Sequence, residues 1–138
     1  VVAACDRVSE SVTVINRNPG REHAIRNSGP NQEIDFISWN SSIDFNMFDL
    51  VVNTTPGEIA SILVNQIGSL SSTFFEVLYN PWPTQLLFHW RKAGGFGIDG
   101  LDLLIHQAIS QVEIFASCEV DREPIAKMLR NVGEKALS

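Results

Sequence analysis

The sequence predicts an α/β protein of three-layer αβα architecture, with a mostly parallel sheet between layers of helices. Short β-rich segments alternate along the chain with segments of helical period. Several of the β-rich segments are apolar throughout, as expected for strands that are covered on both faces of a parallel sheet. At 138 residues, 44% of them hydrophobic, the chain is long enough for one domain with a buried core.

The strands are expected where β-branched and aromatic residues gather in short segments. In chain order these are Val12 to Ile15, Glu33 to Ile37, Asp49 to Asn53, Thr73 to Leu78 and Phe96 to Ile98. Residues 1 to 8 look like the end of a helix that leads directly into the first of these strands.

In a doubly wound nucleotide-binding fold, a strand and a glycine-rich turn precede that helix, and the turn holds the pyrophosphate of a dinucleotide. No G-x-G-x-x-G occurs in this sequence, and no strand precedes residues 1 to 8. The sequence therefore predicts a Rossmann-like fold that lacks its first strand and glycine-rich turn. Because that strand is central in such sheets, its loss leaves two strands without a neighbour, as in part of a longer polypeptide or a truncated product.

Four segments are expected to be helical after the first strands. Pro56 to Ile67 begins with proline, and Thr84 to Ala93 is closed by glycines. Asp99 is suited to cap a third helix, and residues 121 to 137 form a fourth. Their apolar faces are expected to be Ile59, Ile62, Leu63 and Ile67; Leu101, Leu104, Ile105, Ala108, Ile109 and Val112; and Ile125, Met128, Leu129 and Val132.

Charge and cysteine usage exclude several classes of function. The formal net charge is -6, and no Lys or Arg lies between Arg26 and Arg91, so a nucleic-acid partner is not expected. No apolar stretch is long enough for a membrane span. Cys5 and Cys118 fit neither a metal site nor a disulfide framework, which indicates a cytoplasmic protein. The scattered histidines give no zinc pattern, and we assign no catalytic role to His106.

A basic turn follows the first predicted strand, in the segment Asn16-Arg-Asn-Pro-Gly-Arg21. Domains that bind NAD commonly have an acidic residue at the end of this strand, which accepts hydrogen bonds from the ribose. Asn16 in that position, with Arg17 and Arg21 beside it, suits the 2′-phosphate of NADP instead. An ordinary solvated basic turn explains the same residues equally well.

Further polar segments follow later strands. Asn53-Thr-Thr-Pro56 lies at the carboxyl end of an apolar strand, where ligands of open α/β sheets bind, although a plain capped turn would have the same composition. Tyr79-Asn-Pro-Trp-Pro-Thr84 forms a stiff corner after the next strand, and Gln107 lies on the polar side of the helix that begins near Asp99.

Together these segments resemble the C-terminal, NADP-binding domain of the shikimate dehydrogenase family. The motifs are N-R-N-P-G-R, N-T-T-P, V-L-Y-N-P-W-P-T and, most specific, D-G-L-D-L-L-I-H-Q-A at residues 99 to 108. The form Y-N-P-W-P-T looks like that of actinobacterial members. The resemblance covers essentially residues 1 to 138, and it implies an enzyme that reversibly reduces 3-dehydroshikimate to shikimate with NADPH in aromatic amino acid biosynthesis.

The resemblance also implies roles for individual residues. Asn16, Arg17 and Arg21 would bind the 2′-phosphate of the cofactor, and Asn18 stands where the family often has Thr. Thr54 and Thr55 would line the cofactor cleft, and Val77 and Gly100 would contact the nicotinamide end. Tyr79 and Gln107 would reach the shikimate, and no catalytic or metal-binding residue is implied within this chain. The proton-transferring Lys and its partner Asp belong to the family's N-terminal substrate domain, which has no counterpart here.

We therefore expect the chain by itself to be inactive. Two alternatives stay open at this point: a non-catalytic NADP-binding or interaction module, and an enzyme that acts on quinate as well as shikimate. A homodimer is also left open.

Overall fold

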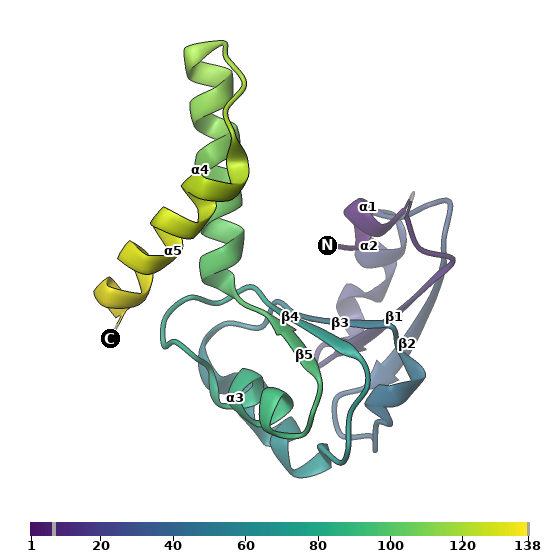
Figure 1. Cartoon of the computed structure of the whole chain (residues 1–138). Helices are drawn as coiled ribbons and strands as arrows, with labels where there is room; N and C mark the ends of the chain where they lie inside the picture. The colour runs from purple at the N-terminus through teal and green to yellow at the C-terminus, as the bar shows by residue number, and fades with distance from the viewer. Residues whose placement is uncertain (7, 138) are drawn as a thin grey trace. The chain divides into compact units, whose positions relative to one another are not determined.

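The structure is a computed structural model that describes residues 1–6 and 8–137, except for the side chains of residues 57 and 58. It divides into two compact units, Val1–Ile43 and Asp44–Ser138, which we call unit 1 and unit 2 (Figure 1). Both units have parallel strands joined by helical segments, so the predicted α/β fold with a parallel sheet is confirmed.

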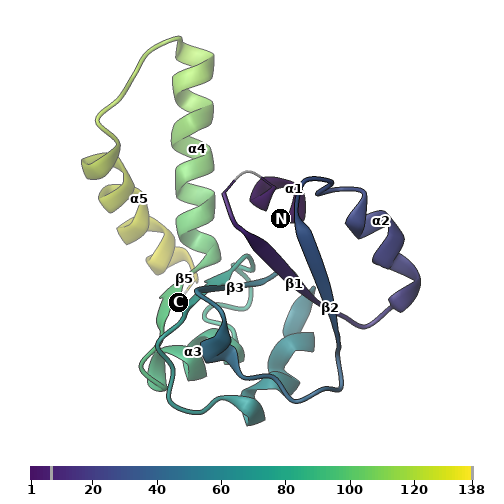
Figure 2. The same ribbon diagram turned by 90° about the vertical axis from the view of Figure 1, so that its right-hand side faces the viewer.

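Unit 1 has a two-stranded parallel sheet (Figure 2). Its elements in chain order are α1 (Val2–Cys5), β1 (Ser11–Asn16), the 3₁₀ turn η1 (Pro19–Arg21), α2 (Glu22–Arg26) and β2 (Glu33–Ser38). The register places Asn16 opposite Ser38, the last residue of each strand. The residues that follow β1 and β2 therefore begin at the same edge of the sheet.

Unit 2 has a three-stranded parallel sheet in the order β3-β4-β5. Its elements are η2 (Phe45–Met47), β3 (Leu50–Asn53), η3 (Gly57–Gln66), β4 (Thr73–Glu76), α3 (Gln85–Lys92), β5 (Phe96–Ile98), α4 (Gly100–Ala116) and α5 (Arg122–Leu137). Among the described strands, β1 pairs with β2 alone and β3 with β4 alone.

The core of unit 2 is built around Trp90 on α3. Its ring is fully buried, stacks on Phe74 of β4 with 4.8 Å between centroids, and meets the edge of Phe45 at 5.1 Å. The indole N–H donates to the Ser72 carbonyl at 3.1 Å, so the buried donor is satisfied. These contacts fix α3 against the sheet.

Helices α4 and α5 form a pair, with α5 folding back beside α4 (Figure 1). Leu101, Ile105 and Ile109 of α4 are buried against apolar residues of α5, including Leu129. A Cβ at Gly133 would lie 2.6 Å from Leu101 Cδ1, so the glycine permits this close approach. Asp99 caps α4 and forms a capping box with Asp102, as the predicted cap requires.

The sequence prediction was wrong about some helix faces. Residues 57 to 66 form a 3₁₀ helix whose buried residues, Ala60 and Leu63, lie three positions apart, as the 3₁₀ repeat requires. Ile62 is therefore exposed, contrary to the predicted α-helical face. On α4 and α5, the residues predicted to be inward but found exposed are Leu104, Ala108, Val112, Met128 and Val132, because a two-helix contact buries a narrower stripe. None of the described helices is long and apolar enough to cross a membrane.

Candidate functional site

A pocket of about 480 Å³ lies at the carboxyl ends of β1 and β2 in unit 1. Its lining includes Asn16 and Arg17 from the end of β1, and Phe36 and Trp39 from β2 and the residues after it. Because β1 and β2 end in register, the next residues, Arg17 and Trp39, face each other. The Arg17 guanidinium carbon lies 5.9 Å from the centroid of the Trp39 ring.

Two asparagines brace the turn that carries the arginines. Asn16 Nδ2 donates to the Asn18 carbonyl at 2.6 Å, and the Asn18 amide donates back to Asn16 Oδ1 at 3.1 Å. Asn18 Oδ1 also accepts from the Gly20 amide at 3.1 Å, which caps η1. These bonds define the direction in which the chain leaves β1.

The two predicted arginines differ in position. Arg17 lines the pocket, whereas Arg21 is exposed in η1 and is not among the lining residues. Neither forms an ion pair with any residue that the structure describes. Glu22 adds a carboxylate to the lining. The pocket thus combines a guanidinium, an aromatic wall and one acidic group.

In unit 2, a buried hydrogen-bond network joins the carboxyl ends of β3 and β4. Glu76, which is 0% exposed, accepts from Asn53 Nδ2 at 3.0 and 3.1 Å and from Thr84 Oγ1 at 2.7 Å. It also accepts from the Leu78 amide at 3.2 Å. Asn53 Oδ1 in turn accepts from the amide and hydroxyl of Thr55, at 3.1 and 2.7 Å. The predicted cleft residue Thr55 is therefore held by β3, while Thr54 beside it is exposed.

Val77 and Gly100, both predicted at the nicotinamide end, lie together. A Cβ at Gly100 would be 2.6 Å from the Val77 carbonyl oxygen and 2.3 Å from that of Leu78. Only glycine allows α4 to begin so close to the end of β4. Tyr79 and Gln107 are exposed, and no described hydrogen bond joins these two predicted substrate residues.

The pKa of Asp99 is clearly perturbed by its surroundings. Burial of its carboxylate alone would raise the pKa, but hydrogen bonds from Arg130, the Asp102 amide and Arg91 outweigh burial and lower the pKa to about 2. The Arg130 guanidinium binds both carboxylate oxygens, at 2.8 and 2.7 Å, and its pKa is raised, mainly by the hydrogen bond to Asp99. Arg130 also lies 5.7 Å from the centroid of the Trp82 ring.

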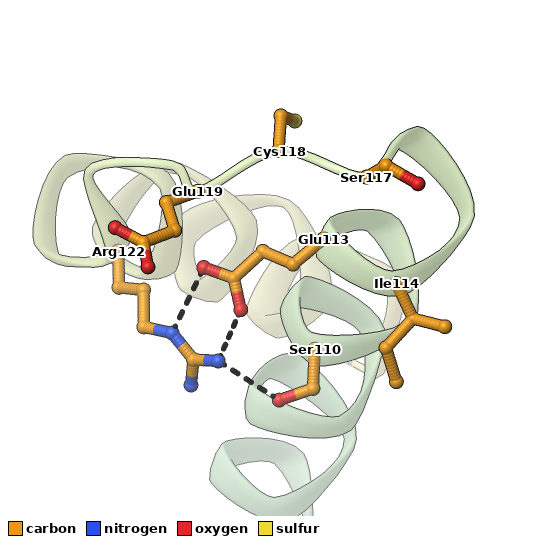
Figure 3. Close-up of a pocket in the computed structure, with 7 residues that line it drawn as sticks. All are labelled: Ser110, Glu113, Ile114, Ser117, Cys118, Glu119 and Arg122. Atoms are coloured by element: carbon orange, nitrogen blue, oxygen red, sulfur yellow. Dashed lines mark hydrogen bonds and ion pairs between the residues drawn. The ribbon is translucent and has the colours of Figure 1, made fainter.

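A second pocket, of about 530 Å³, lies at the turn between α4 and α5 (Figure 3). Its Arg122 points toward Glu113 and Ser110, forms an ion pair with the first and donates to the second at 3.1 Å. The hydrogen bond from Arg122 lowers the pKa of Glu113. Because the Arg122 guanidinium is already bound to Glu113 and Ser110, we assign these contacts a structural role in the turn and propose no ligand for this pocket. The described residues contain no group of three or more His, Cys, Asp or Glu arranged to hold a metal ion.

Sequence reasoning missed Trp39, Glu76 and Arg130. The signal for Glu76 was an acid inside the predicted strand Thr73 to Leu78, next to two phenylalanines. Trp39 follows β2 as Arg17 follows β1, so the pairing could have been found only once the strand register was known. The partner of Asp99 is 31 positions away on another helix, and no local pattern indicates it.

Parallel strands joined by helices, with polar turns at their carboxyl ends, define an α/β protein of the Rossmann-like class. No family model matches the sequence. The chain is 32% identical over 117 residues to the NADP(+) shikimate dehydrogenase of Methanosphaera stadtmanae, covering 77% of this chain and 41% of that protein. In structure it matches the shikimate dehydrogenase of Mycobacterium tuberculosis with a TM-score of 0.81 at 26% identity, covering 95% of this chain and 50% of the other.

The quinate dehydrogenase of Corynebacterium glutamicum, solved with NAD, shares the fold with a TM-score of 0.72 at 22% identity, over 95% of this chain and 50% of that one. Over most of its length, the chain is thus a relative of the shikimate dehydrogenases, and the predicted resemblance is confirmed. The chain spans less than half the length of the curated relative from Methanosphaera stadtmanae.

Proposed function

We propose that this chain is the NADP-binding portion of a shikimate dehydrogenase, which reduces 3-dehydroshikimate reversibly to shikimate. The observation that carries the proposal is the pocket at the ends of β1 and β2, lined by Arg17 and Trp39. A guanidinium suits a phosphate and an aromatic wall suits adenine, so the lining fits the adenosine end of NADP. We expect the protein to act in the cytoplasm, as its unpaired cysteines suggest.

In this proposal each predicted residue has a role in binding or orientation. Arg17 and Arg21 hold the 2′-phosphate, on the turn that Asn16 and Asn18 brace. The residues assigned to the rest of the cofactor and to the substrate are Thr54, Thr55, Val77 and Gly100, then Tyr79 and Gln107. Bound NADPH supplies the hydride. This chain contributes by fixing cofactor and substrate in a short, aligned geometry.

The test is cofactor discrimination by isothermal titration calorimetry. Arg17→Ala removes the guanidinium from the pocket and is expected to weaken NADPH binding about tenfold to a hundredfold, since a charge-assisted bond contributes about 1.5–3 kcal/mol. NADH binding should change little, because NADH has no 2′-phosphate. Arg21→Ala is the matched comparison, and its effect should be smaller, since Arg21 does not line the pocket. Equal affinities of the wild-type chain for NADPH and NADH would remove the role of the arginines.

We also expect the purified 138-residue chain to show no reduction of 3-dehydroshikimate by NADPH. The resemblance assigns the proton-transferring Lys and Asp of the family to a substrate domain, so we expect these 138 residues, assayed alone, to bind and orient without an acid–base partner. The measurement is loss of NADPH absorbance in the presence of substrate, with a full-length shikimate dehydrogenase as positive control. Measurable turnover by this chain would contradict the expectation.

A further inference from the structure

We propose that Glu76 is a positioning residue, which holds together two turns of the proposed site, one assigned to the cofactor cleft and one that contains a residue assigned to the nicotinamide end. The inference rests on the proposed function and adds to it a residue outside the predicted site. The two turns are those of Thr54 and Thr55 after β3 and of Val77 to Tyr79 after β4. Glu76 lies between them, at the end of β4.

The carboxylate contacts both turns and the helix that follows. Through Asn53 Nδ2, at 3.0 and 3.1 Å, Glu76 fixes the side chain whose oxygen binds Thr55. Through the Leu78 amide, at 3.2 Å, it fixes the backbone next to Val77. Through Thr84 Oγ1, at 2.7 Å, it fixes the residue that caps α3. One side chain thus fixes the end of β3, the exit from β4 and the start of α3.

The chemistry of the site calls for a carboxylate in particular. Both oxygens of Glu76 accept hydrogen bonds, and every group around them is a donor. The compensation that the structure describes for this buried group comes from these hydrogen-bond donors. Burying a carboxylate is costly, and an apolar residue at this position would leave the Asn53, Leu78 and Thr84 donors without their acceptor. A carboxylate at this position therefore joins donors from three segments into one network, which favours a role in arranging the turns.

The same network reaches the backbone of the predicted site. The Val77 amide donates to the Asn53 carbonyl at 3.2 Å, and the Val77 and Leu78 carbonyls lie against Gly100. A shift of the Glu76 carboxylate therefore moves Thr55 and Val77 relative to each other. It leaves the residues of unit 1 assigned to the adenosine end untouched, because every partner of the carboxylate lies in unit 2.

The experiment compares two ligands, NADPH and adenosine 2′,5′-bisphosphate, which carries only the adenosine end. Glu76→Gln places an amide nitrogen among donors and loses at least one accepted bond. We expect it to weaken NADPH binding about tenfold, the equivalent of one hydrogen bond, and to leave the bisphosphate affinity unchanged. Both affinities are measured by calorimetry on the 138-residue chain.

Two further variants separate positioning from stability. Glu76→Asp keeps the charge but shortens the reach to Asn53 and Thr84. It should also weaken NADPH binding selectively, by a smaller factor, and it replaces Glu76→Gln as the test if that variant fails to fold. Trp90→Phe removes a buried hydrogen bond elsewhere in unit 2 and serves as the matched destabilised control. It should lower the melting temperature, but it should not weaken NADPH binding more than it weakens binding of adenosine 2′,5′-bisphosphate.

The outcomes are distinct. Equal weakening of both ligands, or no change in either, in the folded Glu76 variants would overturn the positioning role while leaving the proposed function intact. Failure of the wild-type chain to bind either ligand would overturn the proposed function, and the positioning role with it. Selective loss of NADPH affinity supports both.

Discussion

Replacing Arg130 with alanine is expected to lower the free energy of unfolding of unit 2 by about 3 kcal/mol, because it leaves a buried carboxylate without its main partner. Asp99 is 0% exposed, and Arg130 binds both of its oxygens. Arg91 remains as a single contact at 3.1 Å, through a side chain that is 39% exposed. Arg130 also binds Asp102 and Glu134, so its loss loosens the start of α4 and the middle of α5 together.

Arg122→Ala is the matched control on the same helix. Arg122 forms an ion pair with Glu113, but it is 47% exposed, and exposed pairs contribute at most about 1 kcal/mol. Urea unfolding of both variants measures the difference. The Asp99 cluster consists of Asp99 and its ion-pair partners Arg91 and Arg130. If Arg130→Ala lowers the free energy of unfolding no more than Arg122→Ala does, the Asp99 cluster does not stabilise unit 2 as expected.

The Asp99 cluster also gives the protein a defined acid sensitivity. The pKa of Asp99 is about 2 in the folded chain, below the ordinary value of 3.8, so the folded state favours the ionised form of this carboxyl. The resulting stability, about 2 kcal/mol, is fully present above about pH 4 and is lost as the pH falls through 2. In Arg130→Ala, burial is opposed by fewer donors, so the pKa of Asp99 in the folded state should rise toward its ordinary value. The part of the stability that Asp99 makes dependent on acid should then be smaller than in the wild-type chain, as measured by urea unfolding at a series of pH values.

The second large effect is expected for Gly100→Ala. The added methyl would lie 2.3 Å from the Leu78 carbonyl oxygen and 2.5 Å from its carbon, and both are backbone atoms that cannot rotate away. The start of α4 must then move away from β4. We expect a loss of about 3 kcal/mol, at the upper end of the usual cost of overpacking, together with weaker NADPH binding.

Gly68→Ala provides the comparison, because no atom lies within 4 Å of a Cβ built at Gly68. The free energy of unfolding of this variant, measured by thermal unfolding, should change by no more than about 0.5 kcal/mol. If Gly100→Ala unfolds at the same temperature as Gly68→Ala, the proposed close approach of α4 to β4 does not constrain the fold.

The strands and caps could be predicted because their signals are local. β5 occupies Phe96–Ile98 as expected, and Asp99 caps α4. The cap works through Asp102, three residues on, so the pattern lies within one turn of sequence. The 3₁₀ form of residues 57 to 66 was missed, since its apolar residues are equally compatible with an α-helical face.

The candidate site could be predicted only in part. The basic turn after β1 was found because both arginines are close in sequence, but only Arg17 lines the pocket, which depends on the direction of the chain after Asn16. Trp39 contributes through the strand register and Glu76 through a network between strands, and the contacts of both are defined only once the strands are paired. The roles of the residues that bind cofactor and substrate stay predictions.

The buried indole of Trp90 allows the unfolding of unit 2 to be followed by intrinsic tryptophan fluorescence. Packed between Phe74 and Phe45 and away from water, it should emit at shorter wavelength than a solvated indole, and unfolding of unit 2 should shift that emission to the red. Trp39 belongs to unit 1 and lies beside Arg17. Trp39 therefore reports on unit 1, and Trp90 reports on unit 2 together with Trp82, the third tryptophan of the chain.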